Sequence, residues 1–120
     1  MTWRYDQSTG ELSHDGARVA TGYSGSGEGK NNPALEATAN VGPIPRGGYT
    51  VGAPHDTDSH GPYVLRLTPV DGNDCCGRSG FLVHGDSIRA PGSASHGCII
   101  VSRNIREQIW TSGDTDLEVV

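Results

Sequence analysis

The sequence predicts a single all-β or β-dominated domain with one short helix near its C-terminal end. A chain of 120 residues has the size of one domain and cannot build two independent cores. Its 18 glycines and 7 prolines, about twice the usual share, divide the chain into short segments. Most of these segments alternate apolar and polar residues as strands do, and only one carries the spacing of a helix. We therefore expect residues 1–120 to form one domain.

The first part of the chain has the pattern of a meander of short strands. Strands are predicted at residues 2–6, 11–13 and 17–23. The Asp15-Gly16 pair favours a hairpin turn before the last of them, because glycine tolerates the positive φ that such a turn requires. A glycine-rich loop follows over residues 22–32, and Pro33 suits the first position of a helical turn over residues 33–39.

The second part of the chain combines short strands with the predicted helix. Strands are expected at residues 49–51, 63–67 and 117–120, polar loops at 55–60 and 68–80, and two largely apolar strands at 81–84 and 98–101. The helix is expected over residues 102–112, with Ser102 as its cap and Gly113 at its end. Ile105 and Ile109, four residues apart, form its expected buried face.

Charge and hydropathy exclude two classes of partner. The net charge is −5 and Lys30 is the one lysine, so the chain lacks the cationic cluster that a nucleic-acid binder needs. The longest apolar run, residues 98–101, is far shorter than the roughly 20 residues that span a bilayer, so no membrane insertion is expected. The N-terminal residues contain no apolar segment, which predicts a protein made in the cytoplasm without a signal peptide.

The residues that point to chemistry are a histidine and a cysteine at the ends of two apolar segments. His84 ends one predicted strand and Cys98 begins another. If these strands pair, the imidazole can accept the thiol proton, which a cysteine needs in order to attack as a thiolate. Gly97 allows close approach of the backbone to a substrate, and the amides around Cys98 are candidates for an oxyanion site.

The residues alone leave three questions open. Cys98 can instead be an inert core thiol, since free cysteine is among the most buried residue types. A zinc site is a second alternative, although the spacing matches no compact zinc pattern; its ligands would come from His84, Asp86, His96 and Cys98, with His55 or His60. The group that orients His84 also stays open between Ser95, Asp86 and a backbone carbonyl, with the carbonyl favoured.

Two sets of motifs carry a resemblance to known families. The segment Ser95-His96-Gly97-Cys98 resembles the signature of YkuD-type L,D-transpeptidases, in which an upstream histidine and the cysteine form the catalytic pair. Further motifs follow in order along the chain and, together with the first, resemble the L,D-transpeptidase effector family of bacterial type VI secretion systems. These motifs are Trp3-x-Tyr5, Gly22-Tyr23-Ser24-Gly25, Asn31-Asn32-Pro33, Gly42-Pro43-Ile44-Pro45-x-Gly47, Gly61-Pro62-Tyr63-Val64-Leu65-Arg66-Leu67, Gly77-Arg78-Ser79-Gly80-Phe81 and His84-Gly85-Asp86-Ser87.

The resemblance implies a compact L,D-transpeptidase-like β-sandwich or barrel and a specific activity. Members of the effector family are antibacterial toxins that act on peptidoglycan in the periplasm of a rival cell. They remove the terminal D-Ala from tetrapeptide stems as L,D-carboxypeptidases, and they exchange it for other D-amino acids as L,D-transpeptidases. The resemblance therefore implies secretion by type VI components, peptidoglycan tetrapeptide stems as substrate and a cognate immunity protein as partner.

Individual residues are assigned by position. Cys98 matches the nucleophile and His84 the catalytic histidine, with Ser95 as a further candidate catalytic residue. Arg78 and Arg103 are candidates to bind stem carboxylates through forked hydrogen bonds. The remaining candidate substrate-binding residues are Ser79, His96 and Gly97. His96 stands where many members of the effector family carry an acidic residue and where YkuD-type enzymes carry histidine. We expect no metal and no organic cofactor.

Two other functions compete with this one. The same scaffold can serve as a non-catalytic cell-wall-binding module, which would not depend on Cys98. A zinc-dependent peptidoglycan amidase is the second competitor, and chelation would inactivate it. Cys75 and Cys76 are adjacent, so a disulfide between them would be strained, and we expect two loop thiols without an assigned role.

Overall fold

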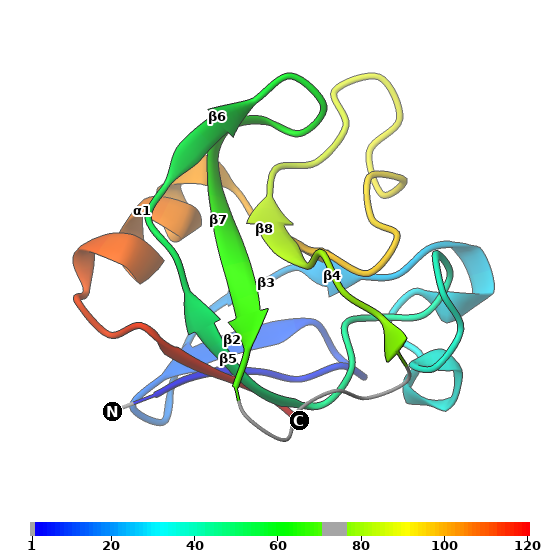
Figure 1. Cartoon of the computed structure of the whole chain (residues 1–120), viewed down its shortest axis with the longest axis horizontal. Helices are drawn as coiled ribbons and strands as arrows, with labels where there is room; N and C mark the ends of the chain where they lie inside the picture. Colours follow the sequence, from blue (N-terminus) through cyan, green and yellow to red (C-terminus); the bar gives the residue numbers. More distant parts are fainter. Residues whose placement is uncertain (1, 71–76) are drawn as a thin grey trace.

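The computed structural model describes residues 2–70 and 77–120, and strands dominate it (Figure 1). This confirms the predicted fold class, with a single α-helix in the described part of the chain. The elements, in chain order, are β1 Trp3–Tyr5, β2 Glu11–His14, β3 Ala17–Thr21, β4 Tyr23–Ser24, the 3-10 turns η1 Gly27–Gly29 and η2 Pro33–Leu35, β5 Gly47–Val51, β6 His55–Thr57, β7 Gly61–Pro69, β8 Leu82–His84, β9 Ile99–Ile100, α1 Arg103–Thr111 and β10 Asp116–Val119.

The strands form one strongly curved sheet in the order β3-β2-β1-β10-β5-β7-β8-β9-β4, with β6 paired to β7. The two ends of this path, β3 and β4, are consecutive segments separated by Gly22 alone, so the sheet curls back on itself in the manner of a barrel. Gly22 is required at this junction: a Cβ there would lie 2.1 Å from the carbonyl oxygen of Ile100. No helix among residues 2–70 and 77–120 is long and apolar enough to cross a membrane.

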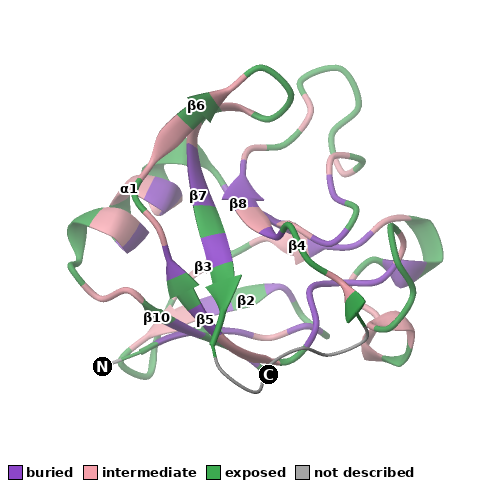
Figure 2. Cartoon of the chain, in the orientation of Figure 1, coloured by how far each residue is buried: buried purple, intermediate pink, exposed green. Residues whose placement is uncertain are grey.

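The core lies inside the curved sheet and is closed on one side by the helix (Figure 2). Strands β1 and β10 pair in parallel and alternate between buried and exposed residues, so that Trp3, Tyr5, Leu117 and Val119 all point inward. Helix α1 packs on β7 and β8 through Ile109, which is 1 % exposed. The core therefore holds β8 and β9 rigidly. His84 ends β8, and Cys98 directly precedes β9.

Three local expectations need correction. The polar segment expected as a loop over residues 55–60 contains strand β6, because β7 extends to Gly61 and offers it a partner. Ser102 precedes α1, but its side chain makes no capping hydrogen bond. The segment predicted as one strand over residues 17–23 divides into β3 and β4, which pair with different partners on either side of Gly22.

The loop between η2 and β5 is held by Glu36. Its carboxylate accepts hydrogen bonds from the backbone and guanidinium of Arg46 and from the side chain of buried Gln7. The hydrogen bonds from Arg46 are the main reason why the pKa of Glu36 falls to about 2. Its carbonyl oxygen, in turn, binds Arg78 in the candidate site. Glu36 thus connects a surface ion pair to the site.

We expect Glu36→Gln to lower the free energy of unfolding by roughly 1 kcal/mol at pH 7, after allowing for solvent screening of this pair. Because the folded-state pKa is depressed, the carboxylate stabilises the protein above its ordinary pKa and loses this effect as the pH falls towards 2. The stability difference between wild type and variant should therefore shrink below about pH 4, as measured by chemical denaturation across pH. Glu118→Gln is the control, since Glu118 forms a long, exposed pair with Arg4; an equal effect in both variants would contradict the assignment.

Candidate active site

The parallel pairing of β8 with β9 brings the histidine and cysteine segments together, which meets the condition on which the sequence argument depended. Val83 pairs with Ile99 and His84 with Ile100, and the amide of Val101 donates to the carbonyl of His84. Cys98 precedes Ile99 and therefore lies level with Leu82, whose amide hydrogen-bonds to the thiol. His84 and Cys98 thus lie diagonally opposite each other on two adjacent segments. Their side chains point to the same face of the sheet.

His84 is buried and its ring is fixed by the backbone. It is 3 % exposed, and its Nδ1 lies 2.9 Å from the carbonyl oxygen of Gly85. A carbonyl can only accept, so Nδ1 carries the proton and Nε2 is left as the basic nitrogen. Burial, aided by the nearby charges of His60 and Arg106, lowers the pKa of His84 despite the Gly85 bond and Asp86. The imidazole is therefore neutral at pH 7 and able to accept a proton.

Cys98 is a partly buried thiol. Burial raises its pKa above the ordinary value, while the Leu82 amide and the positive charge of Arg78 oppose this rise without cancelling it. With a raised thiol pKa and a lowered imidazole pKa, the resting pair is neutral and not a thiolate–imidazolium ion pair. A reaction that used Cys98 as its nucleophile would therefore require proton transfer from the thiol to a base during the attack.

This neutral pair predicts the pH dependence of Cys98 alkylation. Because the pKa of the Cys98 thiol is raised, little of it is thiolate at pH 7, so reaction with iodoacetamide should be slow there and should rise with pH into the alkaline range. Peptide mass spectrometry distinguishes labelling at Cys98 from labelling at Cys75 and Cys76. A rate that stays high and flat down to pH 5 would show an ion pair and contradict this description.

Ser95 has a structural partner set and does not orient His84. Its buried hydroxyl donates to the carbonyl of Cys98 at 2.6 Å and accepts from the amides of Gly25 and Gly97 at 2.9 and 3.1 Å. The His84 ring is instead oriented by the backbone carbonyl of Gly85, and a backbone carbonyl is the kind of group that the sequence analysis favoured. Ser95 therefore positions the loop that precedes Cys98. Because the Gly97 amide donates to the Ser95 hydroxyl, it is not available to an oxyanion.

Gly97 and Arg78 pack against each other, and both line the same cavity as Cys98. Gly97 has φ +134°, and a Cβ there would come within 2.5 Å of Arg78 Nη2, so only glycine fits. Arg78 donates from Nη1 to the carbonyls of Glu36 and Pro43 and from Nη2 to those of Gly42 and His96. All four terminal N–H groups are thereby used, so Arg78 clamps the site's backbone and has only Nε left for a substrate carboxylate.

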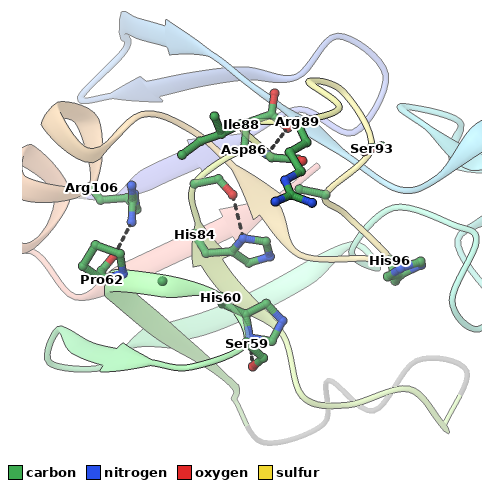
Figure 3. A pocket seen from close by; sticks show the side chains of 14 residues that line it. Ser59, His60, Pro62, His84, Asp86, Ile88, Arg89, Ser93, His96 and Arg106 are labelled. Carbon is green, nitrogen blue, oxygen red and sulfur yellow. Dashed lines mark hydrogen bonds between the residues drawn. The ribbon is translucent and has the colours of Figure 1, made fainter.

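Two cavities meet at the candidate pair. One, of about 390 Å³, is lined by Cys98 and Phe81 together with Arg78, Ser79 and Gly97. The other, of about 670 Å³, is lined by His84, Gly85 and the loop that follows them (Figure 3). His60 and His96 line both cavities, and the His60 ring lies 4.6 Å from the His84 ring. The Cys98 thiol and the His84 imidazole thus line two neighbouring cavities, and His60 and His96 contribute to the lining of both.

The loop over the larger cavity is anchored by Tyr23. The Tyr23 hydroxyl donates to Asp86 at 2.6 Å and accepts from the Ala94 amide at 2.9 Å, and burial together with the Asp86 bond raises its pKa to about 12. The Lys30 ammonium lies 4.5 Å above the Tyr23 ring. These contacts join the Gly-rich loop to the loop after β8. Both segments carry recognisable motifs, but the sequence does not show that they lie in contact.

The structure separates the other candidate residues into two groups. Ser79 and His96 lie at the cavities, as expected. Arg103 does not: it pairs with Glu107 on the exposed side of α1 and lies over the Tyr63 ring. Within residues 2–70 and 77–120, no three His, Cys, Asp or Glu side chains gather in a group that could hold a metal ion. Cys75 and Cys76 lie outside the described residues.

Three residues that line the larger cavity carry no catalytic or substrate-binding prediction from the sequence. They are His60, which the sequence offers only as a possible metal ligand, Arg89 and Arg106. His60 and Arg106 belong to motif-poor segments, and their approach to His84 depends on the pairing of β6 with β7 and on the packing of α1. No local signal in the sequence marks them.

Comparison with known structures supports the fold. Bd1075 from Bdellovibrio bacteriovorus matches with a TM-score of 0.63 at 13 % identity, over 99 % of this chain and 47 % of that chain. L,D-Transpeptidase 1 from Mycobacterium tuberculosis matches with a TM-score of 0.53 at 19 % identity, over 99 % of this chain and 60 % of that chain. The L,D-transpeptidase of Xylanimonas cellulosilytica matches with a TM-score of 0.55 at 21 % identity, over 99 % of this chain and 59 % of that chain. The chain spans about half to three fifths of the length of these structures.

Comparison of sequences gives the family. No curated protein matches the chain. Residues 18–118, which include His84 and Cys98, match the Tlde1 domain. The match covers most of the chain and agrees with the likeness of its fold to L,D-transpeptidases. The chain therefore belongs to the Tlde1 domain family of type VI secretion L,D-transpeptidase effectors.

Proposed function

We propose that this protein is a cysteine L,D-carboxypeptidase and L,D-transpeptidase that removes or exchanges the terminal D-Ala of peptidoglycan tetrapeptide stems. The observation that carries this proposal is the parallel pairing of β8 and β9, which sets the Cys98 thiol and the His84 imidazole on adjoining cavity walls. Membership of the Tlde1 domain family supports peptidoglycan as the substrate class.

In the first half-reaction, Cys98 Sγ attacks the carbonyl of diaminopimelate that is bonded to D-Ala, while its proton moves to His84 Nε2. A negative charge develops on the carbonyl oxygen, and the Cys98 amide stabilises it. The neighbouring Gly97 amide does not contribute, because it donates to the Ser95 hydroxyl. His84 then returns the proton to the nitrogen of D-Ala as the C–N bond breaks. The products are free D-Ala and a thioester between the stem and Cys98.

In the second half-reaction, the thioester is resolved by water or by an amine. His84 Nε2 accepts a proton from the attacking group and returns it to the Cys98 sulfur as the thioester breaks. Water leaves a tripeptide stem, and the amine of a D-amino acid leaves an exchanged tetrapeptide. Both outcomes use the same acyl-enzyme, so one site supports both activities.

The biological setting follows from the family and is part of the proposal. We place the protein's action in the periplasm of a target cell, after delivery by type VI secretion components. A cognate immunity protein would protect the producing cell. The effect on the target is loss of tetrapeptide stems, which are donors for cross-linking of its cell wall.

The proposal is tested by mass analysis of disaccharide-tetrapeptide muropeptide incubated with the reduced protein, with and without D-Met. We expect loss of D-Ala in the first case and its replacement by D-Met in the second, and neither with Cys98→Ala. Unchanged muropeptide, or equal turnover by Cys98→Ala, would overturn the proposal. Binding without turnover would then favour a cell-wall-binding module.

A further inference from the structure

Arg106 on helix α1 is a buried cation without a carboxylate partner. It is 5 % exposed, and the ion pairs of the described residues do not include it. Its Nε is buried and has no hydrogen-bond partner in the described part of the protein. A buried guanidinium without a counter-charge is unfavourable, and such a group is retained where a ligand or a structural role compensates it.

Part of the guanidinium has a structural role. Nη1 donates to the carbonyls of Pro62 and Tyr63 at 2.8 and 2.9 Å. Tyr63 has φ +54°, a conformation that is rare for an aromatic residue, so these bonds hold the start of β7 in place. They account for Nη1 and leave Nε and Nη2 without an assigned function.

The rest of the guanidinium lies beside the catalytic histidine. A Cβ on Gly85, the residue that follows His84, would lie 2.9 Å from Arg106 Nη2, so the end of the guanidinium packs closely against the Gly85 backbone. Arg106 lines the same 670 Å³ cavity as His84, and Figure 3 shows the two on neighbouring parts of its wall. The Nη2 end of the guanidinium is therefore next to the base.

This cavity is suited to an anion. Its lining contains two arginines and three histidines but one carboxylate. That carboxylate, Asp86, already accepts hydrogen bonds from the Tyr23 hydroxyl and from the Ser87 and Gly92 amides. Asp86 is therefore engaged at the cavity rim and does not neutralise Arg106.

We propose that Arg106 and the cavity beside His84 form the subsite for the α-carboxylate of the D-amino acid that leaves or enters during the reaction. This inference rests on the proposed function. His84 Nε2 exchanges its proton with the amine of that amino acid, and the carboxyl carbon is two bonds from the amine nitrogen. Cys98 lines the other cavity and not this one, so the acyl part of the stem and the D-amino acid occupy different compartments.

The subsite explains how one site handles leaving and incoming groups with different side chains. The carboxylate is common to all D-amino acids, whereas their side chains would extend into a cavity much larger than D-Ala needs. Recognition through the carboxylate would also reject water-soluble amines that lack it. Specificity at this position is thus expected for the acid group and not for the side chain.

The test compares D-Met with D-methioninamide as acceptors in the exchange reaction, for wild type, Arg106→Gln and Arg4→Gln. Arg4→Gln is the matched control, because Arg4 is an exposed arginine on β1. A charge-assisted hydrogen bond predicts that Arg106→Gln reduces the preference for D-Met over its amide by about 10- to 100-fold. Arg4→Gln should leave the preference as in wild type. A merely structural Arg106 would slow both acceptors equally, and an unchanged ratio would overturn the inference.

A binding measurement separates this inference from the proposed function. NMR titration of Cys98→Ala with D-Met requires no turnover, and we expect the Arg106 Nε–H signal to shift with D-Met but not with D-methioninamide. If the muropeptide assay fails while this shift is seen, the proposed reaction falls and the carboxylate subsite stands. If turnover is observed while the Arg106 signal does not respond, the subsite falls and the reaction stands.

Discussion

Replacing His84 with glutamine is expected to slow D-Ala release by about 10²- to 10⁴-fold, the usual contribution of a general acid–base group. Glutamine is close to histidine in size and retains polar atoms near Gly85, but it has no titratable nitrogen to accept the Cys98 proton. Because the resting thiol is protonated, loss of this base leaves little nucleophile at pH 7. Steady-state rates with muropeptide, alongside thermal melting to confirm folding, measure the effect.

The control for this substitution is His55→Gln on β6, a half-exposed histidine that lines neither cavity. It should retain wild-type turnover. Turnover by His84→Gln within about fivefold of wild type, too small a loss for a missing general base, would show that another group removes the proton.

Replacing Arg78 with methionine is expected to lower the free energy of unfolding by about 3–5 kcal/mol, because hydrogen bonds to a charged group are each worth roughly 1.5–3 kcal/mol and their loss is not additive. Four carbonyls from three separate segments would lose their donors together. For a domain of this size, that is a large fraction of the total stability. Urea unfolding followed by circular dichroism measures the change.

Two further variants define the origin of the effect. Arg18→Met on β3 removes an exposed arginine and should change stability by less than about 0.5 kcal/mol. Arg78→Lys keeps the charge but replaces the planar fork by a single ammonium, so it should recover only part of the lost stability. Full recovery in Arg78→Lys would mean that charge, and not the geometry of the four bonds, holds the site.

The strands that position the candidate pair could be predicted from local sequence, because their signals are apolar segments with defined ends. The apolar segments 81–84 and 98–101 were sufficient to predict two strands, which the structure contains as β8 and β9. Their pairing, which the sequence left open, is seen in the structure. The helix after β9 was predicted from Ile105 and Ile109, which lie on its inner side as expected. In each case, the signal lay within a few neighbouring residues.

The roles of Arg78 and Ser95 could not be predicted in the same way, since their partners are distant in sequence. Arg78 binds carbonyls at positions 36, 42, 43 and 96, and carbonyls are present on every residue. Nothing in the sequence distinguishes such an arginine from one that binds a substrate carboxylate. Ser95 likewise has three backbone partners, and serine next to a catalytic motif equally suits a catalytic role.

The neighbourhood of His84 was missed because it depends on tertiary pairing of weakly patterned segments. Strand β6 has a polar sequence and exists through its pairing with β7, which positions the turn that carries His60. Arg106 reaches Gly85 only because α1 packs against β7 and β8. Buried polar residues on an otherwise amphipathic helix are therefore the positions where sequence patterns are least informative about function.

The position of β10 has a consequence for how the chain folds. This strand lies between β1 and β5, so residues 3–5 find their parallel partners more than a hundred positions later, at residues 117–119. Until β10 is made, β1 and β5 are unpaired edges that can associate with other chains. Such distant pairing predicts slow, cooperative folding with high contact order. Removal of residues 116–119 should therefore yield an aggregating chain and not a smaller active one.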